Sequence, residues 1–209
     1  MALITPKNNP GYTQLGDHRI LVLEPNYISW LGIYSLIKEV DGKEENICRL
    51  FKVKMLYDIS CSFLPDVILL PSVDGNMNLL ALIQQLSSLA SHSSPPRIVA
   101  CLKDNIPYLD NLLYSLGVQT VVTSLCSPEE LINSLTKEAG EQTVLFTPQE
   151  RNILQEMLAG RSIDRTAKMM GKSIYAISSQ KQAVMQKLKM RNPIELQLLG
   201  GRLIASGIK

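Results

Sequence analysis

The segment from Thr147 to Leu188 carries start and stop signals for three short helices, and these signals constrain the fold more than any other feature. It opens Thr147-Pro148-Gln149-Glu150, which places a capping hydroxyl, a proline at the first helical position and a glutamate three residues on. Glycines and serines punctuate the rest at Gly160, Ser162, Gly171 and Ser173. Glycine is typical just after a helix and serine just before one. Short helices joined by tight glycine turns predict a helix-turn-helix unit.

The third of these expected helices has an unusual surface for a helix exposed to water. Its inward face is indicated by Ile177, Val184 and Leu188, which recur at helical spacing. No aspartate or glutamate occurs between Lys172 and Leu188, whereas solvated helices usually mix charges of both signs. Hydroxyls, amides and lysines remain on its surface, and these groups suit phosphate oxygens and the edges of DNA bases.

Basic residues are concentrated in the same part of the chain. Residues 146–209 contain 11 lysines and arginines against 4 aspartates and glutamates, which gives a net charge of +7. Residues 1–145 contain 10 against 15, a net charge of −5, so that the whole chain carries only +2. A basic excess confined to the helical module is the electrostatic pattern expected of a duplex-binding domain. The alternative is a solvated basic bundle without a nucleic-acid partner.

The preceding part of the chain alternates short apolar runs with longer amphipathic ones. The apolar runs predict strands at about 19–24, 47–53, 66–70, 97–102 and 119–123, with Pro71 stopping the third. Helices are expected after Asn26 and at about 78–89, 107–116 and 127–135. Strands that alternate with helices predict a parallel sheet covered on both faces, of flavodoxin-like size. In that architecture, ligands bind at the carboxyl ends of the strands.

Composition places the chain among globular proteins and argues against several function classes. With 45% hydrophobic and 19% charged residues it is ordinary for a soluble domain. No apolar run approaches the ~18 residues that span a bilayer, and the first residues lack a secretion signal, so a cytoplasmic protein is expected. The histidines and cysteines are scattered without metal-ligand spacing; they are His18, His92, Cys48, Cys61, Cys101 and Cys126. Neither a catalytic site nor a cofactor is therefore expected.

The two modules together resemble the NarL/FixJ family of response regulators, which end in a LuxR-type helix-turn-helix. The residues that fall at the family's spacing include Thr147-Pro148-Gln149-Glu150-Arg151, Leu158-Ala159-Gly160, Ser173, Ile177, Lys187-Leu188 and Asn192. Within the family, Ile177-Ser178-Ser179-Gln180-Lys181 looks closest to RcsB-like regulators. The resemblance implies a lead at 1–18, a receiver-like (βα)5 domain at 19–138, a linker at 139–145 and a four-helix DNA-binding domain at 146–209. It also implies that the third helix enters the major groove and that a fourth, at about 193–206, supports dimerisation.

The sheet module is similar to the family's receiver domain but lacks the chemistry of its phosphorylation site. A working receiver holds Mg²⁺ with clustered carboxylates, because this cation prefers oxygen ligands. The resemblance assigns this pocket to Glu24, Pro25, Pro71, Cys101 and Ser124. Pro71 stands where the phosphoacceptor aspartate belongs, and proline offers no nucleophile. We therefore expect a pseudo-receiver that is not phosphorylated on aspartate.

These observations and the resemblance predict a transcriptional regulator, not an enzyme, that binds double-stranded DNA at promoters and associates with the nucleoid when bound. It is expected to act as a homodimer or as a heterodimer with an RcsB-like partner. Ser178, Ser179 and Gln182 are candidates for base contacts. The candidates for phosphate contacts are Arg165, Lys168, Lys172, Ser173, Tyr175, Lys181 and Lys187. Two alternatives stay open: the Tyr175 ring packs on the helix scaffold, or the whole chain is an interaction-only modulator that does not bind DNA.

Overall fold

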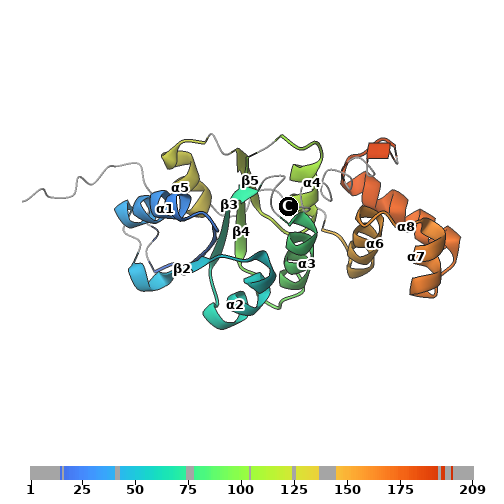
Figure 1. Ribbon diagram of the computed structural model, residues 1–209, viewed down its shortest axis with the longest axis horizontal. Helices are drawn as coiled ribbons and strands as arrows, with labels where there is room; N and C mark the ends of the chain where they lie inside the picture. Colours follow the sequence, from blue (N-terminus) through green and yellow to red (C-terminus); the bar gives the residue numbers. More distant parts are fainter. Residues whose placement is uncertain are drawn as a thin grey trace, which may run out of the picture.

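A five-stranded parallel sheet forms the first part of the protein, in the order β2-β1-β3-β4-β5 (Figure 1). The computed structural model describes residues 15, 17–40, 43–73, 78–103, 105–123, 126–136, 145–192, 194, 195 and 199. The strands are β1 (Ile20–Leu23), β2 (Ile47–Leu50), β3 (Val67–Val73), β4 (Arg97–Leu102) and β5 (Thr120–Thr123). The helices between and after them are α1 (Tyr27–Glu39), α2 (Leu56–Phe63), α3 (Leu79–Leu89), α4 (Leu109–Ser115) and α5 (Pro128–Thr136). The flavodoxin-like fold expected from the sequence is confirmed.

Side-chain alternation along the strands gives the sheet two apolar faces. Leu21 and Ile68 point into a large cluster that α2, α3 and α4 cover. Ile20 and Leu69 point to the other face, where α1 and α5 lie (Figure 1). Both faces are therefore buried, which explains why the strands read as nearly continuous apolar runs.

Strand β3 differs from the expectation at Pro71. It continues through Pro71 and Ser72 to Val73 instead of ending before the proline. Its pairing with β1 ends at Leu69, and its pairing with β4 shifts register between Leu70 and Val73. Proline has no N–H to donate to a ladder, so it is tolerated inside a strand only at such an irregularity.

Other differences concern short elements with little periodicity of their own. Helix α2 was not expected, because its eight residues, of which only Leu56 and Ser60 are buried, give a weak apolar pattern. Strand β2 ends at Leu50, and the short 3₁₀ helix η2 (Val53–Met55) occupies part of the expected strand; a second one, η1 (Glu44–Asn46), precedes β2. Helix α4 begins at Leu109 instead of about residue 107.

Residues 145–192 contain the three expected helices, α6 (Pro148–Leu158), α7 (Ile163–Met170) and α8 (Ile174–Lys187). The capping box is present: the Glu150 N–H donates to Thr147 Oγ1 at 3.2 Å, and Glu150 Oε2 accepts from the Thr147 N–H at 2.7 Å. Gly160 and Gly171 have φ of 76° and 62°, which favours glycine after a helix. Of the expected fourth helix, residues 194, 195 and 199 are helical, and the rest lies outside the described residues. No helix in the described ranges is long and apolar enough to cross a bilayer.

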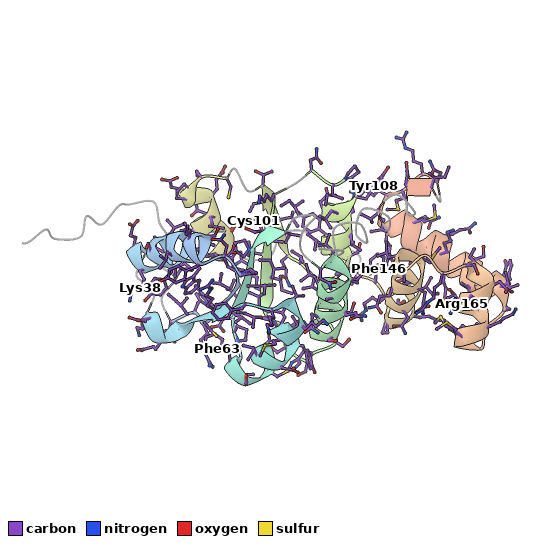
Figure 2. The ribbon with its side chains drawn as sticks, viewed as in Figure 1. Lys38, Phe63, Cys101, Tyr108, Phe146 and Arg165 are labelled. Atoms are coloured by element: carbon purple, nitrogen blue, oxygen red, sulfur yellow. The ribbon has the colours of Figure 1, made fainter. Side chains whose placement is uncertain are left out.

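The helical module packs on the sheet module through α6, which contacts α3. Arg151 Nη1 donates to the Ser87 carbonyl at 2.6 Å. Phe146 is buried between the modules (Figure 2), and its N–H donates to the Ser115 carbonyl at 2.9 Å. The larger apolar cluster runs without a break from the sheet to Leu154 of α6. The expected linker at 139–145, apart from its last residue, lies outside the described residues.

Candidate nucleic-acid interface

Helix α8 has one buried face and one fully exposed face. Ile177 and Val184 are buried completely and pack with α6 and α7. The opposite face is a stripe spaced four, three and four residues apart, which one helix face requires. This outward stripe consists of Tyr175, Ser179, Gln182 and Gln186, all of them exposed. The stripe therefore presents a ring, a hydroxyl and two amides to solvent, with no carboxylate among them.

The first turn of α8 is fixed by local capping. Ser173 is the N-cap, and its Oγ accepts from the Ala176 N–H at 3.1 Å. Tyr175, two residues into the helix, has 84% of its surface exposed. The alternative in which its ring packs on the helix scaffold is therefore wrong for this structure. Lys172 is exposed immediately before the cap.

Four further expected contact residues lie on α8 beside the outward stripe or on α7. Ser178 and Lys181 are partly exposed on the border of the stripe. Arg165 and Lys168 are exposed on α7. Lys168 Nζ lies 3.0 Å from Asp164 Oδ2 one helical turn earlier, an exposed ion pair of the kind that a competing phosphate readily replaces.

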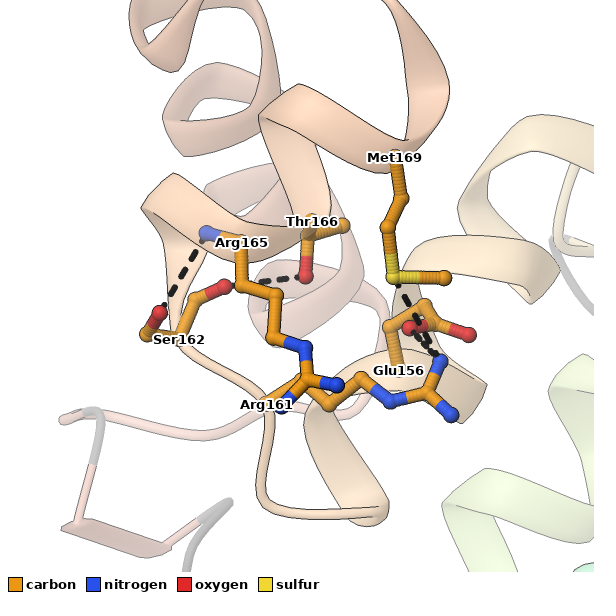
Figure 3. A network of polar contacts seen from close by, with 6 residues as sticks. All are labelled: Glu156, Arg161, Ser162, Arg165, Thr166 and Met169. Carbon is orange, nitrogen blue, oxygen red and sulfur yellow. Dashed lines mark hydrogen bonds and ion pairs between the residues drawn. The ribbon is translucent and has the colours of Figure 1, made fainter.

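The start of α7 is built from polar contacts that leave Arg165 available (Figure 3). Ser162 caps the helix: its Oγ accepts from the Arg165 N–H at 3.3 Å, and its carbonyl accepts from Thr166 Oγ1 at 3.0 Å. Arg161, in contrast, pairs with Glu156 and contacts the Met169 sulfur at 3.8 Å. Among the described residues the Arg165 guanidinium has no ion-pair partner.

Lys187 lies away from the stripe, and its expected role as a phosphate contact is not retained. Its Nζ lies 2.6 Å from Glu150 Oε2 and 2.9 Å from the Leu145 carbonyl. Only 18% of the Lys187 side chain and 9% of the Glu150 side chain are exposed. Burial acts to raise the pKa of Glu150, but hydrogen bonds from Lys187 and Thr147 hold that pKa below its usual value. Lys187 thus fastens α8 to α6.

Four of the five expected pocket positions lie at or near the carboxyl ends of β1, β3 and β4. Glu24 is buried, and its carboxylate accepts from the Asn26 N–H at 2.7 Å and from Ser72 Oγ at 3.2 Å. Arg49 donates to the Glu24 and Pro25 carbonyls, each at 2.9 Å. In the described ranges no three acidic, histidine or cysteine side chains are grouped so as to hold a metal ion.

Cys101, another of the expected pocket positions, is buried (Figure 2). Burial, with a smaller contribution from Cys126, raises the pKa of the Cys101 thiol to about 12. At neutral pH it is a protonated, apolar side chain with little nucleophilic character. Ser124, the fifth expected pocket position, lies outside the described residues.

Sequence reasoning missed two features of this region. Gln186 was left out of the expected DNA contacts, although it belongs to the outward stripe, four residues after Gln182. The Glu150–Lys187 pair was missed because it joins residues 37 positions apart, and no local signal indicates such a contact.

No protein-family model and no curated protein sequence matches the chain. Among solved structures it is similar to RcsB from Salmonella enterica serovar Typhimurium bound to promoter rprA, with 20% identity and a TM-score of 0.48, over 91% of this chain and 99% of that one. An RcsB–DNA complex gives 19% identity and a TM-score of 0.46, over 90% and 98%. A LuxR-family DNA-binding response regulator from Staphylococcus aureus gives 15% identity and a TM-score of 0.47, over 56% and 95%. At these levels of similarity, the function of this chain has to be inferred from its own residues.

Proposed function

We propose that the protein is a DNA-binding transcriptional regulator, not an enzyme, that places α8 in the major groove of promoter DNA. The observation that carries this proposal is the outward stripe of Tyr175, Ser179, Gln182 and Gln186 on α8. Glutamine can pair with both polar edge atoms of adenine, and serine can donate to or accept from several bases. The absence of any carboxylate on this helix removes the groups that phosphates would repel.

Phosphate contacts are assigned to the basic residues around the stripe. Lys172 precedes α8, Lys181 lies on its border, and Arg165 and Lys168 project from α7. The net charge of +7 on residues 146–209 adds a long-range attraction for duplex DNA. Each lysine that neutralises a phosphate should contribute about one unit to the slope of log affinity against log salt.

The arrangement of the two modules supports binding without a prior unmasking step. The sheet module contacts α6 through α3, and the outward stripe stays exposed in the presence of that module. A DNA duplex that approaches α8 therefore does not have to displace the sheet domain. This fits a protein whose sheet domain does not accept a phosphoryl group, as the buried Glu24 and the proline at position 71 suggest.

We further propose a homodimer or a heterodimer with an RcsB-like partner, acting in the cytoplasm and associated with the nucleoid when bound to DNA.

A second candidate function, an interaction-only modulator, is favoured by one surface of the sheet domain. There Tyr27 and Phe51 are exposed, by 63% and 58%, and the Arg49 guanidinium lies 5.6 Å and 4.3 Å from their ring centres. Aromatic residues beside arginine are enriched at the centres of protein interfaces.

Selection of duplexes from a random-sequence pool by the full chain, followed by fluorescence anisotropy, separates the two functions. A regulator enriches a defined sequence, and Gln182→Ala weakens that complex. Gln84→Ala, which truncates an exposed glutamine on α3 of the sheet domain, is the matched control and should leave DNA affinity unchanged. Failure to bind any duplex at low salt, alone or with an RcsB-like partner, would favour the interaction-only function.

Incubation of the full chain with acetyl phosphate and Mg²⁺ tests the pseudo-receiver. We expect no acid-labile phosphoryl group on the sheet domain by mass spectrometry. A stable aspartyl adduct would overturn this part of the proposal.

A further inference from the structure

Tyr175 has the most exposed large apolar side chain in the described part of the protein, at 84%. Its neighbour Ile174 is 55% exposed. Within the described residues, the Tyr175 ring takes part in none of the aromatic or cation–π contacts, unlike the rings of Tyr27, Trp30 and Tyr34. The Tyr175 ring therefore projects from the first turn of α8 without a ring contact in the described part of the protein, and the partly exposed Ile174 lies beside it.

The position of these side chains is as important as their exposure. Tyr175 opens the outward stripe, and Ser179 and Gln182 follow it on the same helix face. In helix-turn-helix proteins the N-terminal residues of the reading helix contact base edges. A ring in this place meets the floor of the groove, where the apolar group that bases display is the C5-methyl of thymine.

We propose that the Tyr175 ring, with Ile174 beside it, contacts thymine C5-methyl groups and makes thymine the preferred base under the first turn of α8. The inference rests on the proposed function and assigns part of its base specificity. It differs from the expectation that Tyr175 contacts phosphate, because a phosphate contact would use the hydroxyl and would carry no base preference. The apolar ring and the polar hydroxyl can be separated experimentally.

The test uses the full chain and the duplex that the random-sequence selection enriches. Each thymine of that duplex is replaced in turn by deoxyuridine, which removes one methyl group and leaves the base pair intact. Burial of one methyl against an apolar side chain corresponds to about a fourfold change in affinity. We expect wild type to lose about that factor at one or two thymines and to be indifferent to the others.

Three variants identify the side chain responsible. Tyr175→Phe keeps the ring and should keep the ratio of affinities for the thymine and uracil duplexes. Tyr175→Ala should remove most of this discrimination at the same positions. Ile174→Ala should reduce the ratio in part. Ile28→Ala removes an exposed apolar side chain from α1 of the sheet domain and should keep the ratio of wild type.

The outcomes separate this inference from the proposed function. If the selected duplex binds equally well with thymine and uracil, or if its enriched sequence contains no thymine, the inference is overturned and the DNA-binding function stands. If Tyr175→Phe loses the discrimination as Tyr175→Ala does, the hydroxyl is the contact and the methyl assignment is wrong. If no duplex is enriched, the proposed function fails and the inference fails with it.

Discussion

Replacing Lys187 by methionine tests whether this lysine holds the fold together or binds DNA. Methionine keeps most of the apolar stem and removes the ammonium group. The variant loses the two contacts of Lys187 Nζ, with Glu150 Oε2 at 2.6 Å and with the Leu145 carbonyl at 2.9 Å. The Glu150 carboxylate, with 9% of its side chain exposed, would lose its cationic partner and keep its bond from the Thr147 N–H.

The expected loss of unfolding free energy follows from the burial of this ion pair. A hydrogen bond to a charged group contributes about 1.5–3 kcal/mol, and removing one partner of a fully buried ion pair costs about 3–5 kcal/mol. The pair here is mostly but not fully buried, and Glu150 retains one backbone donor. We therefore expect Lys187→Met to lower the free energy of unfolding by about 2–3 kcal/mol.

Urea denaturation followed by circular dichroism measures this loss, and anisotropy titrations at several salt concentrations measure the DNA contribution. Lys187→Met should leave the salt slope of DNA binding unchanged under conditions where the variant is folded. The matched control is Lys172→Met, an exposed lysine before α8. That control should keep the stability of wild type and reduce the salt slope by about one unit. The reasoning is refuted if Lys187→Met unfolds like wild type and lowers the salt slope by that unit.

Three further outcomes are expected. The pKa of Glu150 lies below its usual 4.5, because hydrogen bonds such as that from Lys187 outweigh burial. The stability that Glu150→Gln loses relative to wild type should therefore be full above pH 4.5 and should disappear as pH falls through the lower folded-state pKa. A stability difference that persists in strong acid would contradict this. Arg151→Ala removes a 2.6 Å bond between the modules and should lower unfolding stability by about 1–2 kcal/mol in urea; an unchanged midpoint would show that the apolar contact alone joins them. Iodoacetamide at neutral pH should label the exposed Cys61 and spare Cys101, whose pKa burial raises to about 12; rapid labelling of Cys101 in the folded protein, read by mass spectrometry, would contradict its burial.

Local chemistry made most of the helical module predictable. The caps at Thr147 and Ser173 and the glycines at 160 and 171 act within a few residues of their own position, so their roles can be read along the chain. The same holds for β4, in which Arg97 is followed by five apolar residues and whose bounds were predicted as observed.

Contacts between distant residues set the limits of prediction. Pro71 was expected to end β3, but the bulge that accommodates it depends on where β1 and β4 stop pairing with that strand. Lys187 was grouped with the other lysines because its partner Glu150 lies on another helix. The outward face of α8 was predicted in outline, whereas the full exposure of Tyr175 depends on which way the neighbouring helices pack.

The Arg151–Ser87 bond and the buried Phe146 hold the helical module against the sheet domain. In a dimer joined through its sheet domains, the two helical modules would lie at a fixed distance from each other along the duplex. An insertion of about 5 base pairs between the two halves of the operator turns one half to the opposite side of the double helix. Such a protein would tolerate substitutions in the spacer between the half-sites but not changes in its length.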